Sequence, residues 1–191
     1  MTSKKEVDSM NSDSALVMSI GTGDKSAFRV LVERHKKTAY GMALGLVGNR
    51  DDAFDISQEA FLRVYRSAKS FDQRQPFLPW FYTIIANLSR TWLRRRSSRD
   101  HRMVDIDEAS TFLVSDDNPE EAVIRDQQIA RLRQALQKLS FEDREIIVLQ
   151  HFRNMSYDEI AKLLEIPRGT VMSRLYYARK RLAKLMGPND G

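Results

Sequence analysis

The spacing of the apolar residues restricts the fold of this 191-residue chain more than any other feature. Apolar residues recur at intervals of three and four, and no stretch alternates apolar and polar residues over the length of a strand. Intervals of three and four place side chains on one side of an α-helix, whereas a half-buried strand requires alternation. Glycine and proline, which interrupt helices, are scarce. The sequence therefore predicts an all-α fold.

Three helices are predicted in the first half of the chain. The first carries an apolar stripe that ends before Gly48-Asn49, and the next two cover residues 51–67 and 78–96. The stripe of the first helix consists of Phe28, Leu31, Val32, His35, Ala39, Met42, Ala43 and Leu46. The apolar side of the second consists of Ala53, Ile56, Ala60 and Val64, and that of the third of Trp80, Phe81, Ile84, Ile85, Leu88 and Trp92.

Signals for helix starts divide the second half of the chain. The segment 118–121, NPEE, combines an N-cap residue, a proline at the first helical position and acids in the first turn. Ser140 with Asp143, and Ser156 with Glu159, match the capping-box pattern of a serine followed three residues later by an acid. The helix that starts near residue 119 is expected to bury Ile129, Leu132, Leu136 and Leu139.

The predicted helices form two small domains, at residues 14–97 and 118–187, and residues 1–13 form a polar tail. Residues 98–117 have no clear periodicity and are expected to form a flexible linker. The connecting region is acidic, because residues 100–121 contain eight aspartates and glutamates against one arginine. The sequence therefore predicts two helical domains joined by a flexible acidic linker.

Composition and motif content exclude several kinds of site. The chain has no cysteine, so it contains neither disulfides nor thiolate metal sites. No apolar stretch approaches the roughly 20 residues of a membrane span, and the N-terminus lacks the apolar core of a signal peptide. The three histidines lack ligand spacing, and no Walker, GxSxG or GxGxxG pattern occurs. We therefore expect a cytoplasmic binding protein that is not an enzyme and uses no cofactor or metal.

Positive charge is concentrated in two segments, each at the end of an apolar-periodic stretch. Residues 90–99 contain five arginines, residues 168–184 contain six basic residues, and neither segment contains an acid. One charged run is as often a solvated surface as a binding site. Two such runs in a chain of net charge +5 favour a nucleic-acid partner.

Residues 156–182 have the spacing of a helix-turn-helix. A short helix with Ile160, Ala161 and Leu164 on its apolar side is followed by a turn through Glu165-Ile166, and Pro167 starts the next helix. The second helix is expected to bury Val171, Leu175, Ala178 and Leu182. An ordinary helical hairpin has the same pattern, but the basic, acid-free second helix favours insertion into the major groove of DNA. The residues expected at the DNA are Arg168, Thr170, Ser173, Arg174 and Tyr177.

Residues 76–96, PFLPWFYTIIANLSRTWLRRR, place aromatic rings beside arginines without any acid. The core residues of this segment are interpreted as Trp80, Ile84, Leu88 and Trp92. The remaining surface is expected to offer Phe77, Tyr82, Asn87, Arg90, Arg94, Arg95 and Arg96. Rings can stack on unpaired bases, arginines can hold phosphates, and Asn87 can read the edge of an extruded base. These residue types favour single-stranded or melting DNA over intact duplex.

Taken in order, these segments resemble an extracytoplasmic-function sigma factor, the smallest class of specificity subunit of bacterial RNA polymerase. DDAFDISQEAFLRVY is similar to the family's clamp-binding segment, and PFLPWFYTIIAN is similar to its promoter-melting segment. LSFEDREIIVLQHFRNMSYDEIAKLLEIPRGTVMSRL is similar to its C-terminal domain. The resemblance covers residues 24–186, with the three motifs in the family's order and spacing.

The resemblance implies a role for each part of the chain. The N-terminal domain would bind and melt the minus-ten promoter element, the C-terminal domain would bind the minus-35 element, and the acidic linker would enter the RNA exit channel. The residues that would face the clamp of the largest polymerase subunit are Asp52, Asp55, Gln58 and Glu59. Three of these are acids on one side of a helix, which suits a basic partner. Phe54 replaces a usual acid, and Met172 and Tyr177 stand where the family often has Lys or Arg.

The partners that the resemblance implies are core RNA polymerase, through its clamp and the flap region of its second-largest subunit, promoter DNA and an anti-sigma factor. The implied function is promoter-specific initiation in a stress response. Two alternatives remain at this point: a dimeric helix-turn-helix regulator, and a sigma-like decoy that sequesters an anti-sigma factor. A regulator does not require the matches at 51–65 and 76–96, and a decoy is expected to lose its basic recognition helix.

Overall fold

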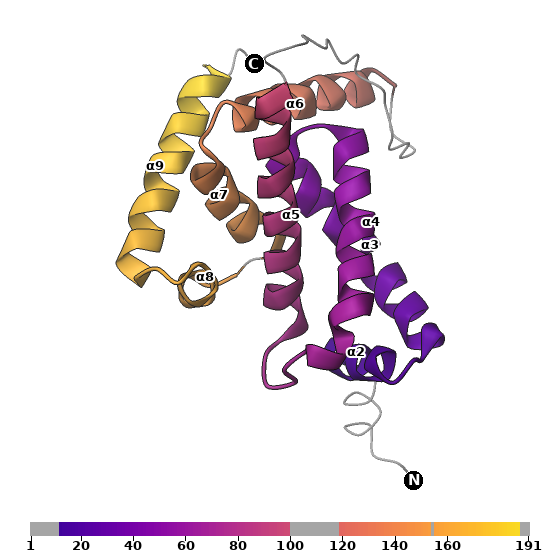
Figure 1. Cartoon of the computed structure of the whole chain (residues 1–191). Coiled ribbons are helices and arrows are strands. Elements are labelled where there is room, and N and C mark those ends of the chain that lie inside the picture. The colour runs from indigo at the N-terminus through magenta and orange to yellow at the C-terminus, as the bar shows by residue number, and fades with distance from the viewer. Residues whose placement is uncertain (1–11, 100–118, 154, 188–191) are drawn as a thin grey trace. The chain divides into compact units, whose positions relative to one another are not determined.

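The computed structural model describes residues 12–99, 119–153 and 155–187, and within these ranges the chain is helical (Figure 1). The first part contains α2 (Asp13–Gly21), α3 (Lys25–Val47), α4 (Arg50–Ser67), the short 3-10 helix η1 (Ala68–Ser70) and α5 (Phe77–Arg99). The second part contains α6 (Pro119–Gln137), α7 (Phe141–Arg153), α8 (Tyr157–Leu164) and α9 (Arg168–Met186). The all-α prediction is confirmed, and α2 is a helix that the apolar pattern did not predict.

The chain divides into two compact units, Met1–Thr91 and Trp92–Gly191, so the division falls inside α5. The proposed domain limits, 14–97 and 118–187, stay a prediction. Most of the tail at 1–13, linker residues 100–117 and the N-cap Asn118 lie outside the described residues, whereas residues 98 and 99 belong to α5. None of the helices described is both long enough and apolar enough to cross a membrane.

The break between α3 and α4 forms at the predicted position. Gly48 adopts φ 79°, and its N–H donates to the carbonyl of Leu44 at 2.9 Å. This left-handed conformation favours glycine, which has no Cβ to clash with the backbone. Asn49 then caps α4, because its Oδ1 accepts from the N–H of Asp52 at 2.9 Å. Two residues therefore end one helix and start the next, and α3 packs directly against α4.

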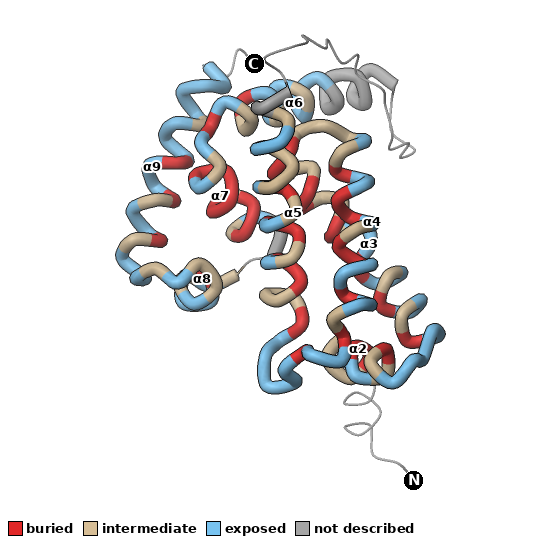
Figure 2. Tube along the Cα trace, in the orientation of Figure 1, coloured by how far each residue is buried: buried red, intermediate tan, exposed pale blue. Residues whose placement is uncertain are grey.

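The core of the first unit contains most of the residues that the apolar spacing predicted. On α3 all of the predicted stripe is buried except Phe28 and Val32, which are half-buried, and all four predicted residues of α4 are buried. Ring contacts join α4 to α5, since the centroids of Phe61 and Phe81 lie 4.9 Å apart. Figure 2 shows buried positions recurring along α4 and α5. The hydrophobic burial of these sides holds the unit together.

The buried side of α5 differs from the predicted one. Trp80, Ile84, Leu88 and Trp92, interpreted as core, are only half-buried. Among the α5 residues whose side chains are described, 77–96, the buried ones include Phe81 and Ile85 of the predicted apolar side. The others are Phe77, Tyr82, Ala86 and Ser89. The contacts that fix this side are made by Phe77 with His35 of α3 and by Phe81 with Phe61 of α4, and Phe77 and Phe81 lie four residues apart on one side of α5. Apolar spacing alone does not show where such neighbours lie.

Helix α2 is joined to α3 by a carboxylate that a guanidinium and an imidazole approach. Asp13 Oδ1 accepts from Arg34 Nη1 at 2.7 Å, and Asp13 Oδ2 lies 2.9 Å from Nε2 of the buried His35. Desolvation works to raise the pKa of Asp13, but the hydrogen bonds and charges of His35 and Arg34 outweigh it and hold the pKa below its usual value. The ionised carboxylate therefore stabilises the contact between α2 and α3.

Replacing Asp13 with Asn is expected to lower the free energy of unfolding by about 1–2 kcal/mol at neutral pH, because a charge-assisted hydrogen bond is lost. Since folding lowers the Asp13 pKa, this contribution is present above its ordinary pKa of 3.8 and disappears as the pH falls below that value. Urea denaturation at pH 7 and at pH 3 measures both effects. Equal stability of wild type and Asp13→Asn at pH 7 would contradict this role for the contact.

The second unit is built from α7, α8 and α9, with the end of α6 packed against them. The largest fully buried side chains of this unit, among the described residues, are Ile146, Leu149, Ile160, Val171 and Leu175. Among the α6 residues whose side chains are described, 127–137, Ala135 is buried, Leu136 is half-buried, and Ile129 and Leu132 are exposed; Leu139, just beyond the end of the helix, is also buried. The prediction that Ile129 and Leu132 are buried is wrong, because the described buried positions lie further along, at and just beyond the C-terminal end of α6.

Arg144 of α7 is a buried cation that ties the end of α6 to α7. Its guanidinium donates to the carbonyls of Leu136, Gln137 and Leu139 at 3.0–3.1 Å and to Gln137 Oε1 at 2.6 Å. The last carbonyls of a helix have no partner within it, so a cation placed there satisfies them and suits the negative end of the helix dipole. Desolvation lowers the pKa of Arg144, which nevertheless remains charged.

Candidate surfaces for nucleic acid and polymerase

Helices α8 and α9 form the predicted helix-turn-helix. Ser156 and Glu159 make the predicted capping box, with the N–H of Ser156 donating to Glu159 Oε2 at 2.8 Å. This bond, followed by that from the Ser156 hydroxyl, holds the pKa of Glu159 below its usual value. The turn passes through Glu165, which adopts the left-handed region at φ 54°, and α9 begins after Pro167.

The buried side of α9 fixes which residues face outward. Val171, Leu175 and Ala178 are buried, as predicted, and Leu182 is half-buried. Among the five residues proposed to contact DNA, Arg168, Ser173 and Tyr177 are exposed and Thr170 and Arg174 are half-buried. The same exposed surface also carries Met172, Tyr176 and Lys180, which sequence reasoning did not assign to DNA. The predicted buried stripe of α9 could have identified these three residues, because positions opposite a buried i, i+4, i+7 stripe face solvent.

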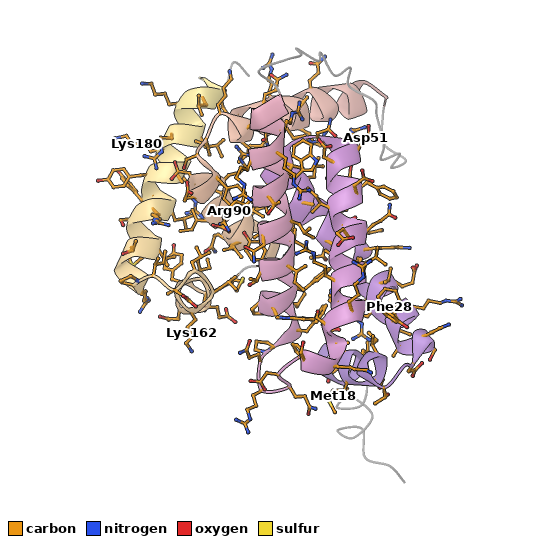
Figure 3. The ribbon with its side chains drawn as sticks, viewed as in Figure 1. Met18, Phe28, Asp51, Arg90, Lys162 and Lys180 are labelled. Atoms are coloured by element: carbon orange, nitrogen blue, oxygen red, sulfur yellow. The ribbon has the colours of Figure 1, made fainter. Side chains whose placement is uncertain are left out.

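An exposed row on α5 brings together part of the proposed minus-ten surface. Asn87, Arg90 and Arg94 are exposed at intervals of three and four, so they lie on one side of the helix (Figure 3 marks Arg90). Arg90 Nη1 donates to Asn87 Oδ1 at 3.2 Å. With its oxygen engaged in this way, Asn87 can donate to a base through its amide N–H groups. Thr83 extends the row by one turn and was missed by the sequence analysis.

Two aromatic residues expected on this surface lie elsewhere. Phe77 and Tyr82 are each 2% exposed, so the expectation that they form part of the accessible surface is wrong. Phe77 stacks on Phe81 with centroids 5.1 Å apart, and its ring also contacts His35. The rings of this segment thus hold α5 in the core, and its polar and basic residues form the outer surface.

The remaining arginines of the segment lie beyond the exposed row. Arg95 is exposed, and Arg96 is half-buried. The guanidinium of Arg96 lies 5.2 Å from the ring centroid of Trp92, within the range of a cation–π contact. Arg94, Arg95 and Arg96 therefore form a basic end to α5 in the described residues, next to the row that carries Asn87.

Helix α4 carries the proposed polymerase-binding residues on its outer side. Asp55 and Gln58 are exposed, and Asp52 and Glu59 are half-buried. Asp52, Asp55 and Glu59 follow one another at intervals of three and four and form an acidic row. Glu59 Oε1 lies 3.4 Å from both Arg63 and Arg66, so its charge is partly balanced within the helix.

An apolar strip lies beside the acidic row on α4. Phe54, Leu62 and Tyr65 are exposed, although each is large and apolar or aromatic. Tyr65 makes an edge contact with Phe28 of α3, with centroids 5.2 Å apart. Acidic and apolar side chains therefore border each other on one helix, and this combination suits a protein partner that offers both basic and apolar groups.

Comparison with known proteins places both units in one protein class. The family model for sigma-70 region 2 matches residues 31–99, and the model for sigma-70 region 4 matches residues 129–182. The first match covers the acidic row and the α5 surface, and the second covers the helix-turn-helix. These two modules on one chain define a sigma-70-type transcription initiation factor.

Relatives that match most of the chain identify the class of sigma factor more narrowly. The RNA polymerase sigma-H factor of Pseudomonas aeruginosa is 32% identical over 182 residues, which is 92% of this chain and 94% of that protein. The ECF RNA polymerase sigma factor SigW of Bacillus subtilis is 32% identical over 176 residues, 88% of this chain and 93% of that protein. The chain belongs to the extracytoplasmic-function (ECF) sigma factors. It acts in transcription initiation, and the family is not enzymatic.

Solved structures show the same fold. The structure of CnrH in complex with the cytosolic domain of CnrY has a TM-score of 0.66 and 26% identity, covering 91% of this chain and 96% of that chain. The sigma factor RpoE of Bartonella quintana, in complex with the anti-sigma factor NepR, has a TM-score of 0.67 and 24% identity, covering 83% and 96%.

Proposed function

We propose that this sigma factor directs core polymerase to promoters by a division of labour among α4, α5 and α9. The α4 acidic row binds the clamp of the largest subunit, the α5 row opens and reads the minus-ten element, and α9 reads the minus-35 element. The observation that carries the proposal is the exposed row on α5, where Asn87 is held by Arg90 beside a basic helix end. An amide that can read a base thus lies beside cations that can hold the phosphates.

The contact with the clamp is supported by charge and by neighbouring apolar surface. The acidic row can pair with basic residues of a partner, and Phe54 can add buried apolar area at its border. The flap region of the second-largest subunit is the corresponding partner of the second unit. A protein that binds polymerase and promoter DNA acts where both are found, so we infer that it acts in the cytoplasm.

An anti-sigma factor is the further partner that we infer. The support is that two of the similar structures, CnrH and RpoE, are complexes with a second protein, which in the RpoE structure is an anti-sigma factor. A stress response is the corresponding biological setting, because a sequestered sigma factor is released when its inhibitor is removed.

Reconstituted transcription with purified core polymerase tests the proposed function. Core enzyme with this protein should start RNA synthesis at defined promoters, and core enzyme alone should not. A dimeric regulator, the alternative from the sequence, would bind duplex DNA as a dimer and would not confer initiation on core enzyme. A decoy would bind an anti-sigma factor and also fail to support initiation.

The role of Asn87 can be tested by its base preference. Asn87→Ala should reduce discrimination at one minus-ten position by about tenfold, because a base-edge hydrogen bond to that base is lost. Permanganate footprinting of promoters that carry each of the four bases at each minus-ten position measures this preference. Arg95→Ala is the matched control, and it should weaken all promoters similarly because phosphates carry no sequence. A wild-type base preference in Asn87→Ala would disprove the assignment.

A further inference from the structure

The centre of α9 presents an unusual surface for a helix that binds DNA. Met172, Tyr176 and Tyr177 are 51%, 62% and 53% exposed, and the rings of the two tyrosines lie 5.2 Å apart. Between residues 169 and 178 the one cationic residue is Arg174, which lies at the half-buried flank. The outward surface of the middle of α9 is therefore apolar and aromatic, although the helix is basic toward its C-terminal end.

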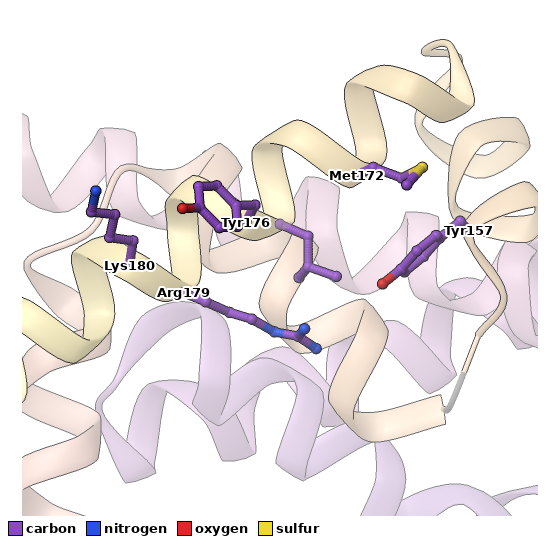
Figure 4. Close-up of a pocket in the computed structure, with 6 residues that line it drawn as sticks. Tyr157, Met172, Tyr176, Arg179 and Lys180 are labelled. Carbon is purple, nitrogen blue, oxygen red and sulfur yellow. The ribbon is translucent and has the colours of Figure 1, made fainter.

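A shallow cleft lies along the same surface. It has a volume of about 510 Å³ and is lined by Tyr157 of α8 and by Met172, Leu175, Tyr176, Arg179 and Lys180 of α9. Figure 4 shows Met172, Tyr176 and Lys180 at successive turns of α9, with Tyr157 on the side of the cleft nearest Met172. The cleft is apolar near the start of α9, and cationic side chains border it one to two turns further along.

The exposed side chains of α9 indicate which groups of a DNA duplex the helix would contact. Arginine bound to guanine is the commonest specific contact in the major groove, and it requires a guanidinium directed at the base edges. The outward centre of α9 offers instead a thioether and a phenol ring, whose apolar atoms match the 5-methyl group of thymine. Met172 and Tyr176 are four residues apart, about 6 Å along the axis, which is close to the rise of two base pairs.

We propose that Met172 and Tyr176 make the minus-35 specificity of this sigma factor a preference for A·T pairs, by contacting the methyl groups of thymines at two positions that lie two base pairs apart. Arg179 and Lys180 then hold the phosphates that flank these base pairs. The inference rests on the proposed function, in which α9 reads the minus-35 element.

Duplex DNA is the occupant that charge favours over a protein segment. Residues 168–184 carry six basic residues and no acid. Arg168 and Arg181 pair with Asp158 and Asp143, and Arg179, Lys180 and Lys184 add positive charge on the C-terminal side of the apolar centre. A phosphate backbone that borders a major groove matches that distribution, with apolar methyl groups beside the line of negative charge.

The test begins with the holoenzyme formed from this protein and core polymerase. Promoters with a fixed minus-ten element and a randomised minus-35 element are selected by transcription, and we expect the recovered sequences to share A·T pairs at two positions that lie two base pairs apart. Each selected thymine is then replaced by uracil, which removes only the methyl group. Loss of one buried methyl contact should reduce promoter binding about fourfold.

Variants assign this effect to the side chains. Met172→Ala and Tyr176→Ala should each bring the ratio of thymine to uracil binding at one position close to one, while the affinity for core polymerase stays unchanged. Lys184→Ala is the matched control on the same helix, and it should weaken both templates equally and keep the ratio. Met172→Arg should shift the selected base at its position toward guanine.

The possible failures separate the two proposals. An active holoenzyme with a thymine-to-uracil ratio of one, or with G·C pairs selected at these positions, overturns the inference alone. Loss of core binding in Tyr176→Ala with an unchanged ratio also overturns it, and assigns the cleft to polymerase. A protein that supports no transcription from any promoter in the library refutes the proposed function, and the inference with it.

Discussion

Reversing Asp55 and Glu59 to lysine together is expected to lower the affinity of this sigma factor for core RNA polymerase about a thousandfold. Placing like charges opposite one another at an interface costs several kcal/mol, and about 4 kcal/mol corresponds to this factor. Asp55 is exposed and Glu59 half-buried on the outer side of α4, so a partner can reach both. Fluorescence anisotropy with labelled protein and purified core enzyme measures the affinity.

The control for this experiment is a charge reversal on another helix of the same unit. Glu33 of α3 is exposed and pairs with Lys36 at 2.6 Å, so Glu33→Lys raises the net charge by two, half of the change in the double reversal, on a different helix. Glu33→Lys should retain near-wild-type affinity. Circular dichroism should show unchanged helix content in both proteins, because surface reversals rarely unfold helices. Wild-type affinity in the doubly reversed protein would be incompatible with clamp binding by the α4 acidic row.

Replacing Arg144 with Met is expected to destabilise the second unit by about 3–5 kcal/mol, because several buried acceptors lose their donor at once. The carbonyls of Leu136, Gln137 and Leu139 all accept from this one guanidinium. Native-state hydrogen exchange on the full chain measures the effect, since protection of amides in α7 and α9 should fall at least a hundredfold.

Two further variants sharpen the result. Arg144→Lys keeps the charge but loses the planar fork, so it should be intermediate between wild type and Arg144→Met. Arg131 is exposed on α6, and Arg131→Met should change the stability by no more than about 0.5 kcal/mol. Unchanged protection in Arg144→Met would show that water replaces the guanidinium at the end of α6. In the proposed function, Arg144→Met should also impair promoters that depend on the minus-35 element more than those that do not.

Several features of this protein follow from its sequence by local physical rules. Helix bounds are set by capping chemistry and by the glycine at position 48, and both act between residues that are close along the chain. All four residues predicted to be buried on α4 are buried, although Ser57 and Phe61 were missed, and on α9 three of the four predicted residues are buried. Spacing succeeds here because each helix buries one stripe. The order and spacing of three motifs identified the family, which comparison with known proteins confirmed.

Tertiary structure decided which rings of the aromatic segment are accessible and which charges pair across helices. Phe77 and Tyr82 are buried and Trp80 is only half-buried, because the side of α5 that faces the core is fixed by contacts such as those of Phe77 with His35 of α3 and of Phe81 with Phe61 of α4. Asp13 contacts both Arg34 and His35, although Arg34 lies 21 positions further along the sequence. Such contacts depend on how helices are oriented against each other, and a local pattern defines only the surface that each helix offers for packing.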